Sequence, residues 1–169
     1  MVKIMDYKHV SHESIPPYIN DDSNILILGS LPSIASRKDG FFYAHPQNRF
    51  FKVLACVFNE KEPITIEERK AFLKRNKIAL YDVIYECDIC GSSDATIKNV
   101  VSIPLADILK KFPNIKRIYT TGKKAKALYD KYLLPEVKIE AIGLPSTSPA
   151  NAGMSLEVLL EHYKIIIQK

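Results

Sequence analysis

The sequence predicts an α/β domain in which helices cover both faces of a mostly parallel sheet. Short runs rich in Ile, Leu and Val alternate along the chain with amphipathic helical patterns. The first run, Ile25–Leu28, is uniformly apolar, which is typical of a strand covered on both faces. With 169 residues, 47% of them hydrophobic, the chain can form one good core. We therefore predict a single three-layer α/β/α domain over residues 1–169, with a central, mostly parallel four-stranded sheet.

The first half of the chain supplies a strand and two helices. Residues 1–23 are mixed and polar, and we expect them to form an N-terminal arm. The first strand is predicted over Asn24–Ser30. A helix is predicted over Pro46–Asn59, because proline suits the first helical position and phenylalanines recur at helical spacing. A second helix is predicted over Thr65–Asn76, which has an acidic first turn and a basic last turn.

The second half continues the alternation. Ile78–Ile89 is rich in Ile, Val and Tyr, which predicts a strand running into a polar segment, Cys90–Val101. The remaining predicted elements are a short helix at Leu105–Phe112, a strand at Ile115–Thr121, a helix from Gly122 to about Leu134, a strand at Val137–Leu144 and a helix at Met154–Gln168.

The charge balance permits an acidic partner without requiring one. The 24 Lys and Arg residues exceed the 19 Asp and Glu residues, which gives a net charge of +5 at pH 7. No apolar run approaches the ~20 residues of a membrane span, and the charged N-terminus does not resemble a signal peptide. We expect a cytoplasmic protein, associated with the nucleoid if the source is prokaryotic, that does not bind a membrane.

The cysteines do not predict a metal centre. Cys87 and Cys90 have CxxC spacing, but a zinc or iron–sulfur site normally needs four ligands and Cys56 is the one remaining cysteine. A redox pair would be expected at the start of a helix, whereas this motif follows a strand pattern. Structural cysteines are the favoured interpretation, and no metal or cofactor is predicted.

The loops richest in chemistry lie where the fold would place a ligand. In folds of this class the ligand binds beyond the carboxyl ends of the strands. This rule selects Ser30–Asn48, Cys87–Asn99, Thr121–Lys124 and Leu144–Gly153. Neither a GxxxxGK motif followed by Ser or Thr nor a GxGxxG motif occurs, so an NTPase or dinucleotide enzyme is poorly supported.

The loop Ser30–Asn48 combines aromatic, basic and amide groups. Tyr43 lies among cations, including Arg37 and Lys38, and aromatic faces beside cations suit stacking on a nucleobase. The alternative is that the aromatic residues simply join the core. Asn48 follows closely, and its amide could either satisfy backbone donors at the helix start or hydrogen-bond a substrate.

The other loops suit phosphate groups. Gly122-Lys123-Lys124 combines charge with a helix N-terminus, although an ordinary solvated face explains it equally well. The segment from Leu144 to Asn151 is rich in Pro, Ser and Thr. It could be a surface turn or a rigid loop that grips a phosphate and wedges into a duplex. Asp94 is the carboxylate expected near this edge, as a cap or a group that orients water.

Three segments together resemble the uracil-DNA glycosylase superfamily. They are Gly29–Ser33, Tyr43–Phe51 and Leu144–Asn151, in that order along the chain. The resemblance is closest to the hypoxanthine-DNA (deoxyinosine) glycosylase branch and to the mismatch-specific uracil/thymine-DNA glycosylase branch. It implies a monomeric, monofunctional glycosylase without metal or cofactor. Such an enzyme flips a deaminated base out of double-stranded DNA and hydrolyses its N-glycosidic bond.

The resemblance also implies roles for individual residues. Tyr43 matches the aromatic residue that stacks on the extruded base, and His45 would frame the pocket. Pro149–Asn151 lies where an inserting wedge is expected. Ser30 and Leu31 match the segment whose backbone binds the base edge, and Ser146 and Ser148 lie in the motif that pinches phosphates. Independently of the resemblance, we also expect Ser33, Gly122, Lys123 and Asn151 to contact the DNA.

One departure from the family pattern concerns catalysis. The third position of the first motif usually holds an Asp or Asn that handles water, and here it is Leu31, which can do neither. Leu144 likewise stands where some branches carry His or Asn. Catalysis would then move to Asn48, acting by orientation and hydrogen bonding. Two alternatives remain: a non-catalytic module that binds damaged or single-stranded DNA, and a small domain that binds a nucleotide or phosphorylated metabolite.

Overall fold

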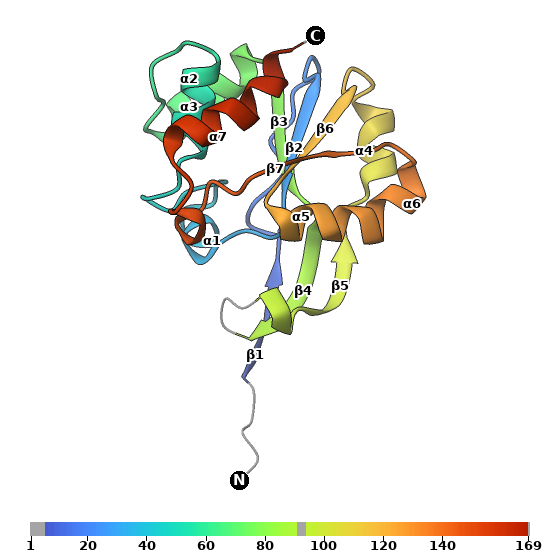
Figure 1. The fold of residues 1–169 in the computed structure, drawn as a ribbon. Helices are drawn as coiled ribbons and strands as arrows, with labels where there is room; N and C mark the ends of the chain where they lie inside the picture. Colours follow the sequence, from blue (N-terminus) through green and yellow to red (C-terminus); the bar gives the residue numbers. More distant parts are fainter. Residues whose placement is uncertain (1–5, 91–93, 169) are drawn as a thin grey trace.

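A computed structural model describes residues 6–90 and 94–168, and its centre is a four-stranded parallel sheet (Figure 1). Its strands are β2 (Ile25–Gly29), β3 (Ile78–Asp82), β6 (Arg117–Thr121) and β7 (Ile142–Leu144), in the order β3-β2-β6-β7. Every neighbouring pair in this sheet is parallel. All of β2 and β3 is buried, as their apolar sequences predict for strands covered on both faces.

Helices cover both faces of this sheet, which confirms the three-layer α/β/α prediction. On one face lie α2 (Phe50–Val57), α3 (Ile66–Arg75) and α7 (Leu156–Tyr163) (Figure 1). On the other lie α4 (Leu105–Lys111), α5 (Lys123–Leu128) and α6 (Leu134–Val137). Thr65 caps α3 by accepting from the backbone N–H of Glu68, and the helix has the acidic first turn and basic last turn that the sequence predicted.

A second, antiparallel sheet extends from the body and was not predicted. It consists of β1 (Tyr7–Ser11), β4 (Ile84–Cys90) and β5 (Lys98–Ser102), in the order β1-β4-β5. The predicted strand Ile78–Ile89 is therefore divided at Val83, and its second half leaves the parallel sheet. Because β3 leads directly into β4, the second sheet begins at the carboxyl edge of the first. The expected N-terminal arm thus contributes a strand, which pairs along β4 from Tyr7 to Ser11.

Several predicted boundaries shift for identifiable reasons. Residues 46–49 form a turn, and α2 begins at Phe50 rather than Pro46. The long loop after β2 contains a short helix, α1 (Ile34–Asp39), which Ser33 caps and which ends at Gly40 with a φ of 73°. The helix after β6 passes through a π-helix at Tyr129–Leu133 just before Pro135, whose ring removes a backbone donor. The helix persists to Val137, so β7 is shorter than predicted.

The two cysteines of the CxxC motif occupy β4. Cys87 is buried and Cys90 is half-buried. Residues three apart in a strand point to opposite faces, so this arrangement suits structural cysteines rather than a redox pair. Among the described residues, no group of His, Cys, Asp and Glu side chains is arranged to hold a metal ion. Within the same residues, no helix is long and apolar enough to cross a membrane.

Candidate active site

A cavity of about 630 Å³ opens at the carboxyl edge of the parallel sheet. Three of the four loops predicted for this edge contribute to its lining, namely those after β2, β6 and β7. The predicted site residues that line the cavity are Ser30, Leu31, Ser33, Tyr43, Asn48, Gly122, Lys123, Ser146, Ser148 and Asn151.

Tyr43 forms a wall of the cavity. Its ring stacks on Phe50 with centroids 3.7 Å apart and an interplanar angle of 11°, which leaves the opposite face toward the cavity. The hydroxyl is 3.0 Å from Thr121 Oγ1. Burial of that hydroxyl, with a contribution from the negative charge of Asp82, raises the pKa of Tyr43 well above its ordinary value. Tyr43 also has a φ of 53°, an uncommon backbone conformation for an aromatic residue. The ring is therefore a fixed, neutral surface.

Asn48 presents a hydrogen-bond donor to the same cavity. Its Oδ1 accepts from the backbone N–H of Phe50 at 2.9 Å and from the hydroxyl of Thr147 at 2.8 Å. A backbone N–H can bond only to the amide oxygen, so these contacts fix the orientation of the side chain. With both acceptor positions of Oδ1 occupied, the group that Asn48 can offer a ligand is its Nδ2.

The loop after β7 is tied to the segment that carries Asn48. The backbone N–H of Arg49 donates to the carbonyl of Thr147, whose side chain is buried. The Arg49 guanidinium donates to the carbonyls of Met154 and Asn151, at 2.8 and 3.1 Å. Arg49 therefore ties the two motifs together.

Within this loop the hydroxyls already bond to one another. Ser146 Oγ donates to Ser148 Oγ at 3.0 Å and accepts from the Ser148 backbone N–H at 3.1 Å. Asn151 Nδ2 donates to the Ser146 carbonyl at 2.9 Å. Tyr163 of α7 donates to the Pro145 carbonyl at 2.6 Å, and burial raises its pKa far above the usual value. These contacts make the loop rigid.

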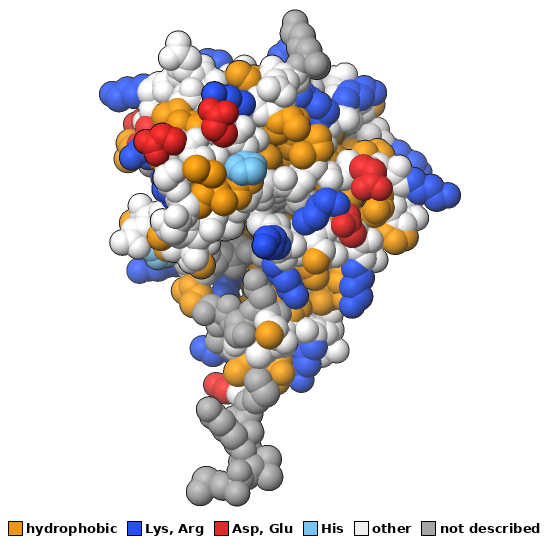
Figure 2. Space-filling model, in the orientation of Figure 1, with side chains coloured by type: hydrophobic (Ala, Val, Ile, Leu, Met, Phe, Trp, Pro, Cys, Tyr) orange, Lys and Arg blue, Asp and Glu red, His pale blue; other side chains and the backbone are white. Residues whose placement is uncertain are grey.

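The predicted DNA contacts around the start of α5 divide into two kinds. The backbone N–H of Gly122 donates to the Leu144 carbonyl at 2.7 Å, so it is not available to a phosphate. Lys123 and Lys124 are exposed, and Figure 2 shows basic side chains at the surface over the start of α5. Ser33 uses its hydroxyl to cap α1, accepting from the Ser36 N–H at 3.0 Å.

His45 does not reach the described lining of the cavity. Its Nδ1 accepts from the backbone N–H of Gln47 at 3.1 Å, and its carbonyl accepts from the N–H of Asn48 at 2.9 Å. These contacts give His45 a role in shaping the turn that presents Asn48. Direct contact with a base stays a prediction.

The carboxylate at this site is Asp82, which sequence reasoning missed. Asp82 ends β3, lines the cavity and is 5% exposed. Its Oδ2 lies 2.9 Å from Nε2 of the buried His12, which follows β1. The rule that selected the other strand ends would have selected Asp82 had the predicted strand Ile78–Ile89 been divided after Asp82. Asp94, the carboxylate expected here, begins a 3₁₀ turn beyond β4, and its side chain lies outside what the structure describes.

The fold and site together define an α/β/α protein whose cavity, at the carboxyl edge of the sheet, is bordered by an aromatic ring and an amide side chain. Residues 16–166 match the family described as the uracil DNA glycosylase superfamily, and the chain belongs to that superfamily.

Similar proteins agree with this assignment. A hypoxanthine DNA glycosylase from Methanosarcina barkeri is 38% identical over 115 residues, which are 67% of this chain and 72% of that protein. One from Methanosarcina acetivorans is 31% identical over 141 residues, or 83% and 88% of the two chains. The solution structure of a proposed uracil DNA glycosylase from M. acetivorans superposes with a TM-score of 0.76 at 28% identity. It covers 91% of this chain and 97% of its own.

Proposed function

We propose that this protein is a monofunctional DNA glycosylase of base-excision repair that removes hypoxanthine from double-stranded DNA. Uracil and mismatched thymine are the second class of substrate. The observation that supports this proposal most directly is that Tyr43, with one ring face not covered by Phe50, and Asn48, with its Nδ2 donor, line one cavity. The names of the two Methanosarcina relatives support hypoxanthine as the first substrate.

The contacts of Asn48 suggest how it contributes to bond cleavage. As the glycosidic bond breaks, the base leaves with negative charge, and a fixed donor that stabilises this charge lowers the barrier. Nδ2 is such a donor, and its orientation is set before the substrate arrives. Oδ1 is occupied, so Asn48 is poorly suited to accept a proton from water. Its role is therefore to stabilise the leaving base.

The surroundings of the cavity suit the DNA backbone. Exposed Lys123 and Lys124 provide positive charge at the rim, where phosphates on either side of a flipped nucleotide would lie. The rigid Ser146–Ser148 turn lines the same cavity, with Ser146 next to Gly122 at the start of α5. The proposed wedge, Pro149–Asn151, forms a 3₁₀ turn with an exposed Ala150 at its centre.

The test compares variants at Asn48 in single-turnover excision of hypoxanthine from a duplex, followed by alkaline cleavage. Asn48→Ala should remove most activity, but it also removes the hydrogen bonds that Oδ1 accepts from the Phe50 N–H and the Thr147 hydroxyl. Asn48→Asp keeps an oxygen for Phe50 and Thr147 while replacing Nδ2 with an acceptor. We expect Asn48→Asp to lose ~10²-fold or more in rate, the typical loss when a fixed donor is removed.

Thr147→Val is the matched control, since it removes one structural bond to Oδ1 and leaves Nδ2 in place; we expect a smaller loss. Full or increased activity in Asn48→Asp would instead assign Asn48 a role as base or water acceptor.

Leu31 supports one other candidate, a module that binds damaged DNA without cleaving it. Leu31 lines the cavity and provides no group that could handle water. This candidate predicts salt-dependent binding that favours lesions, with no abasic product from any deaminated base. An abasic product from hypoxanthine or uracil duplexes would reject it.

A further inference from the structure

Arg49 makes contacts that the proposed reaction does not yet explain. One guanidinium nitrogen donates to the Met154 carbonyl at 2.8 Å, and the other donates to the Asn151 carbonyl at 3.1 Å. The guanidinium suits this double contact, because its N–H groups lie in a fixed planar fork that a lysine ammonium lacks. Arg49 is half-buried, and the two carbonyls that it meets are neutral. Partial burial of a charge costs solvation, so this arrangement invites a functional explanation.

The two carbonyls belong to a turn at the edge of the cavity. Pro149–Asn151 is a 3₁₀ turn, and the Met154 N–H donates to the Asn151 carbonyl at 3.1 Å. Asn151 and Met154 line the cavity. We call residues 149–154 the rim turn. Within the part of the chain that the structure describes, Arg49 is the one side chain outside the loop after β7 that hydrogen-bonds to the rim turn.

The backbone of Arg49 helps to hold Asn48 by a separate route. The N–H of Arg49 donates to the Thr147 carbonyl at 3.1 Å, and the Thr147 hydroxyl donates to Asn48 Oδ1 at 2.8 Å. Any side chain except proline at this position keeps that backbone N–H. A substitution of Arg49 therefore releases the rim turn, while the hydrogen bonds that orient Asn48 remain.

The rim turn has a task only when the target base leaves a duplex. Extruding a base breaks its pairing and stacking and opens a gap between the neighbouring bases. Ala150 is exposed and lines the cavity, so the rim turn stands at the cavity mouth, where this gap would lie. A turn held in place can enter the gap directly, whereas a loose turn must first be ordered, and the entropy lost on ordering opposes extrusion. A single strand has no such gap.

We propose that Arg49 is a positioning residue that fixes the rim turn relative to Asn48, so that the turn enters the gap in a duplex as the base reaches the amide. Arg49 acts through the carbonyls of Asn151 and Met154 rather than on the reacting atoms. The proposal rests on the proposed function, and it makes excision from a duplex depend on Arg49 far more than excision from a single strand.

Excision of hypoxanthine from one sequence, presented as a duplex and as a single strand, tests this dependence. Single-turnover rates at saturating full-length protein would be compared for the wild type and Arg49→Met, which removes both donors. The ratio of the duplex rate to the single-strand rate should fall ~10-fold or more, the range for lost hydrogen bonds from a charged group. Arg49→Lys, which keeps the charge and can reach one carbonyl, should recover part of the ratio. An unchanged ratio in Arg49→Met would overturn the proposal.

Two controls separate this role from a general loss of structure or of chemistry. Arg117→Met removes a guanidinium that also donates to a backbone carbonyl, that of Gln168 at 2.8 Å, from the start of β6 and so from the sheet edge opposite the cavity. It should leave the ratio unchanged. Asn48→Asp should lower both rates by a similar factor, because the leaving base needs the amide donor in either substrate. Equal losses on the two substrates in Arg49→Met would make Arg49 merely structural and reject the positioning role.

Extrusion measured without cleavage shows which claim has failed. A duplex would carry 2′-fluoroarabino hypoxanthine, which resists cleavage, beside 2-aminopurine, whose fluorescence rises when its neighbour unstacks. At saturation the wild type should raise the fluorescence and Arg49→Met should raise it much less.

If this difference appears but the wild type excises no base, the positioning role stands and the proposed function is wrong. If the wild type excises hypoxanthine and Arg49→Met keeps both the fluorescence and the rate ratio, the positioning role is wrong and the proposed function stands. A wild type that neither extrudes nor excises the base would overturn both. If Arg49→Met fails to fold, Arg49→Lys decides by the same ratio, and a wild-type ratio there would overturn the proposal.

Discussion

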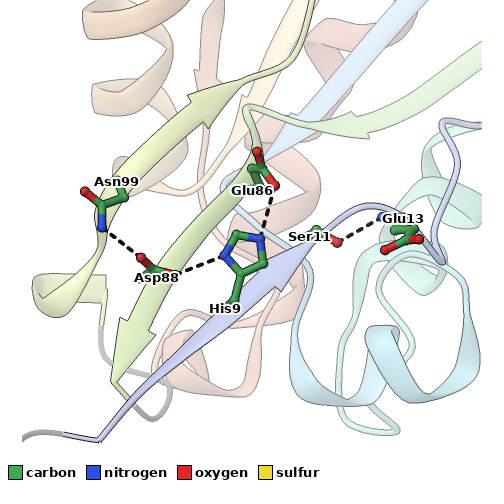
Figure 3. A network of polar contacts seen from close by, with 6 residues as sticks. All are labelled: His9, Ser11, Glu13, Glu86, Asp88 and Asn99. Carbon is green, nitrogen blue, oxygen red and sulfur yellow. Dashed lines mark hydrogen bonds and ion pairs between the residues drawn. The ribbon is translucent and has the colours of Figure 1, made fainter.

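Two histidines near the N-terminus, three positions apart, pair with carboxylates in opposite environments. His9 of β1 lies on the outer sheet, with Nε2 3.1 Å from Glu86 and Nδ1 3.0 Å from Asp88, and Asn99 also donates to Asp88 (Figure 3). Its side chain is 59% exposed, whereas that of His12 is 0% exposed. The same chemical groups therefore form one cluster that is exposed to solvent and one pair that is buried away from it.

The comparison shows that the burial of a histidine–carboxylate pair decides whether stability alone can explain it. An exposed ion pair loses little when it is broken, because water replaces the partner. A buried pair must overcome the desolvation of both groups, and replacing it with apolar residues often preserves or increases stability. The His12–Asp82 pair is therefore poorly explained by stability alone, and its place at the cavity supplies the explanation. The His9 cluster needs no such role.

The largest expected effect is on the rate of excision, when the Asp82 carboxyl group is displaced by a substitution at a neighbouring residue. Gly29→Ala would place a Cβ on Asp82 Oδ1 and force the carboxyl group aside. Misplacing a site group by about 1 Å can cost ~10²-fold in rate, so we expect a loss of that order in single-turnover excision of hypoxanthine. Gly143→Ala is the matched control, because its Cβ would meet only the flexible Lys126 side chain, at 3.6 Å or more. Equal losses in both variants would contradict a special role for Asp82.

The next effect concerns stability. His12→Phe leaves Asp82 without its buried partner, and such losses cost about 3–5 kcal/mol. Combining it with Asp82→Leu should recover most of this free energy of unfolding in urea. A double variant as unstable as the single one would show that the pair is structural, which would weaken the contrast with His9.

The smallest effect is expected at His9. Hydrogen bonds to Asp88 and then to Glu86 raise the pKa of His9, and bonds from Asn99 and then His9 lower that of Asp88. A raised histidine pKa stabilises the fold fully below its unfolded value of about 6.5 and loses that effect as pH rises through the folded pKa. His9→Gln should therefore lower the urea midpoint slightly near pH 5.5 and not at pH 8.5. A deficit that grew with pH would contradict this sign.

Local patterns were sufficient for the parallel sheet and for much of the cavity. The uniformly apolar β2 predicted a covered strand, and the rule about carboxyl ends brought Tyr43, Asn48 and Ser146 to one edge. The second, antiparallel sheet β1-β4-β5 could not be predicted from local patterns. Its strand β1 is mixed in sequence and is fixed by pairing with β4, about 80 residues away.

Sequence reasoning missed Asp82 and His12 for the same reason, because their contacts depend on long-range strand pairing. Asp82 is embedded in an apolar run that continues into β4, so its position at a strand end becomes visible only once Val83 is seen to divide the run. His12 reaches Asp82 only because β1 pairs with β4. The use of the Gly122 N–H by Leu144 likewise depends on β6 and β7 lying side by side. Each of these contacts joins residues distant in sequence, which local periodicity does not encode.

We propose that this member of the uracil-DNA glycosylase superfamily excises hypoxanthine with Asn48 as a donor to the leaving base. Single-turnover excision from one hypoxanthine duplex, measured side by side for the wild type and Asn48→Asp, tests it most directly. We expect an abasic product from the wild type and a rate lower by ~10²-fold or more in Asn48→Asp. No product from the wild type, or an undiminished rate in Asn48→Asp, would contradict it.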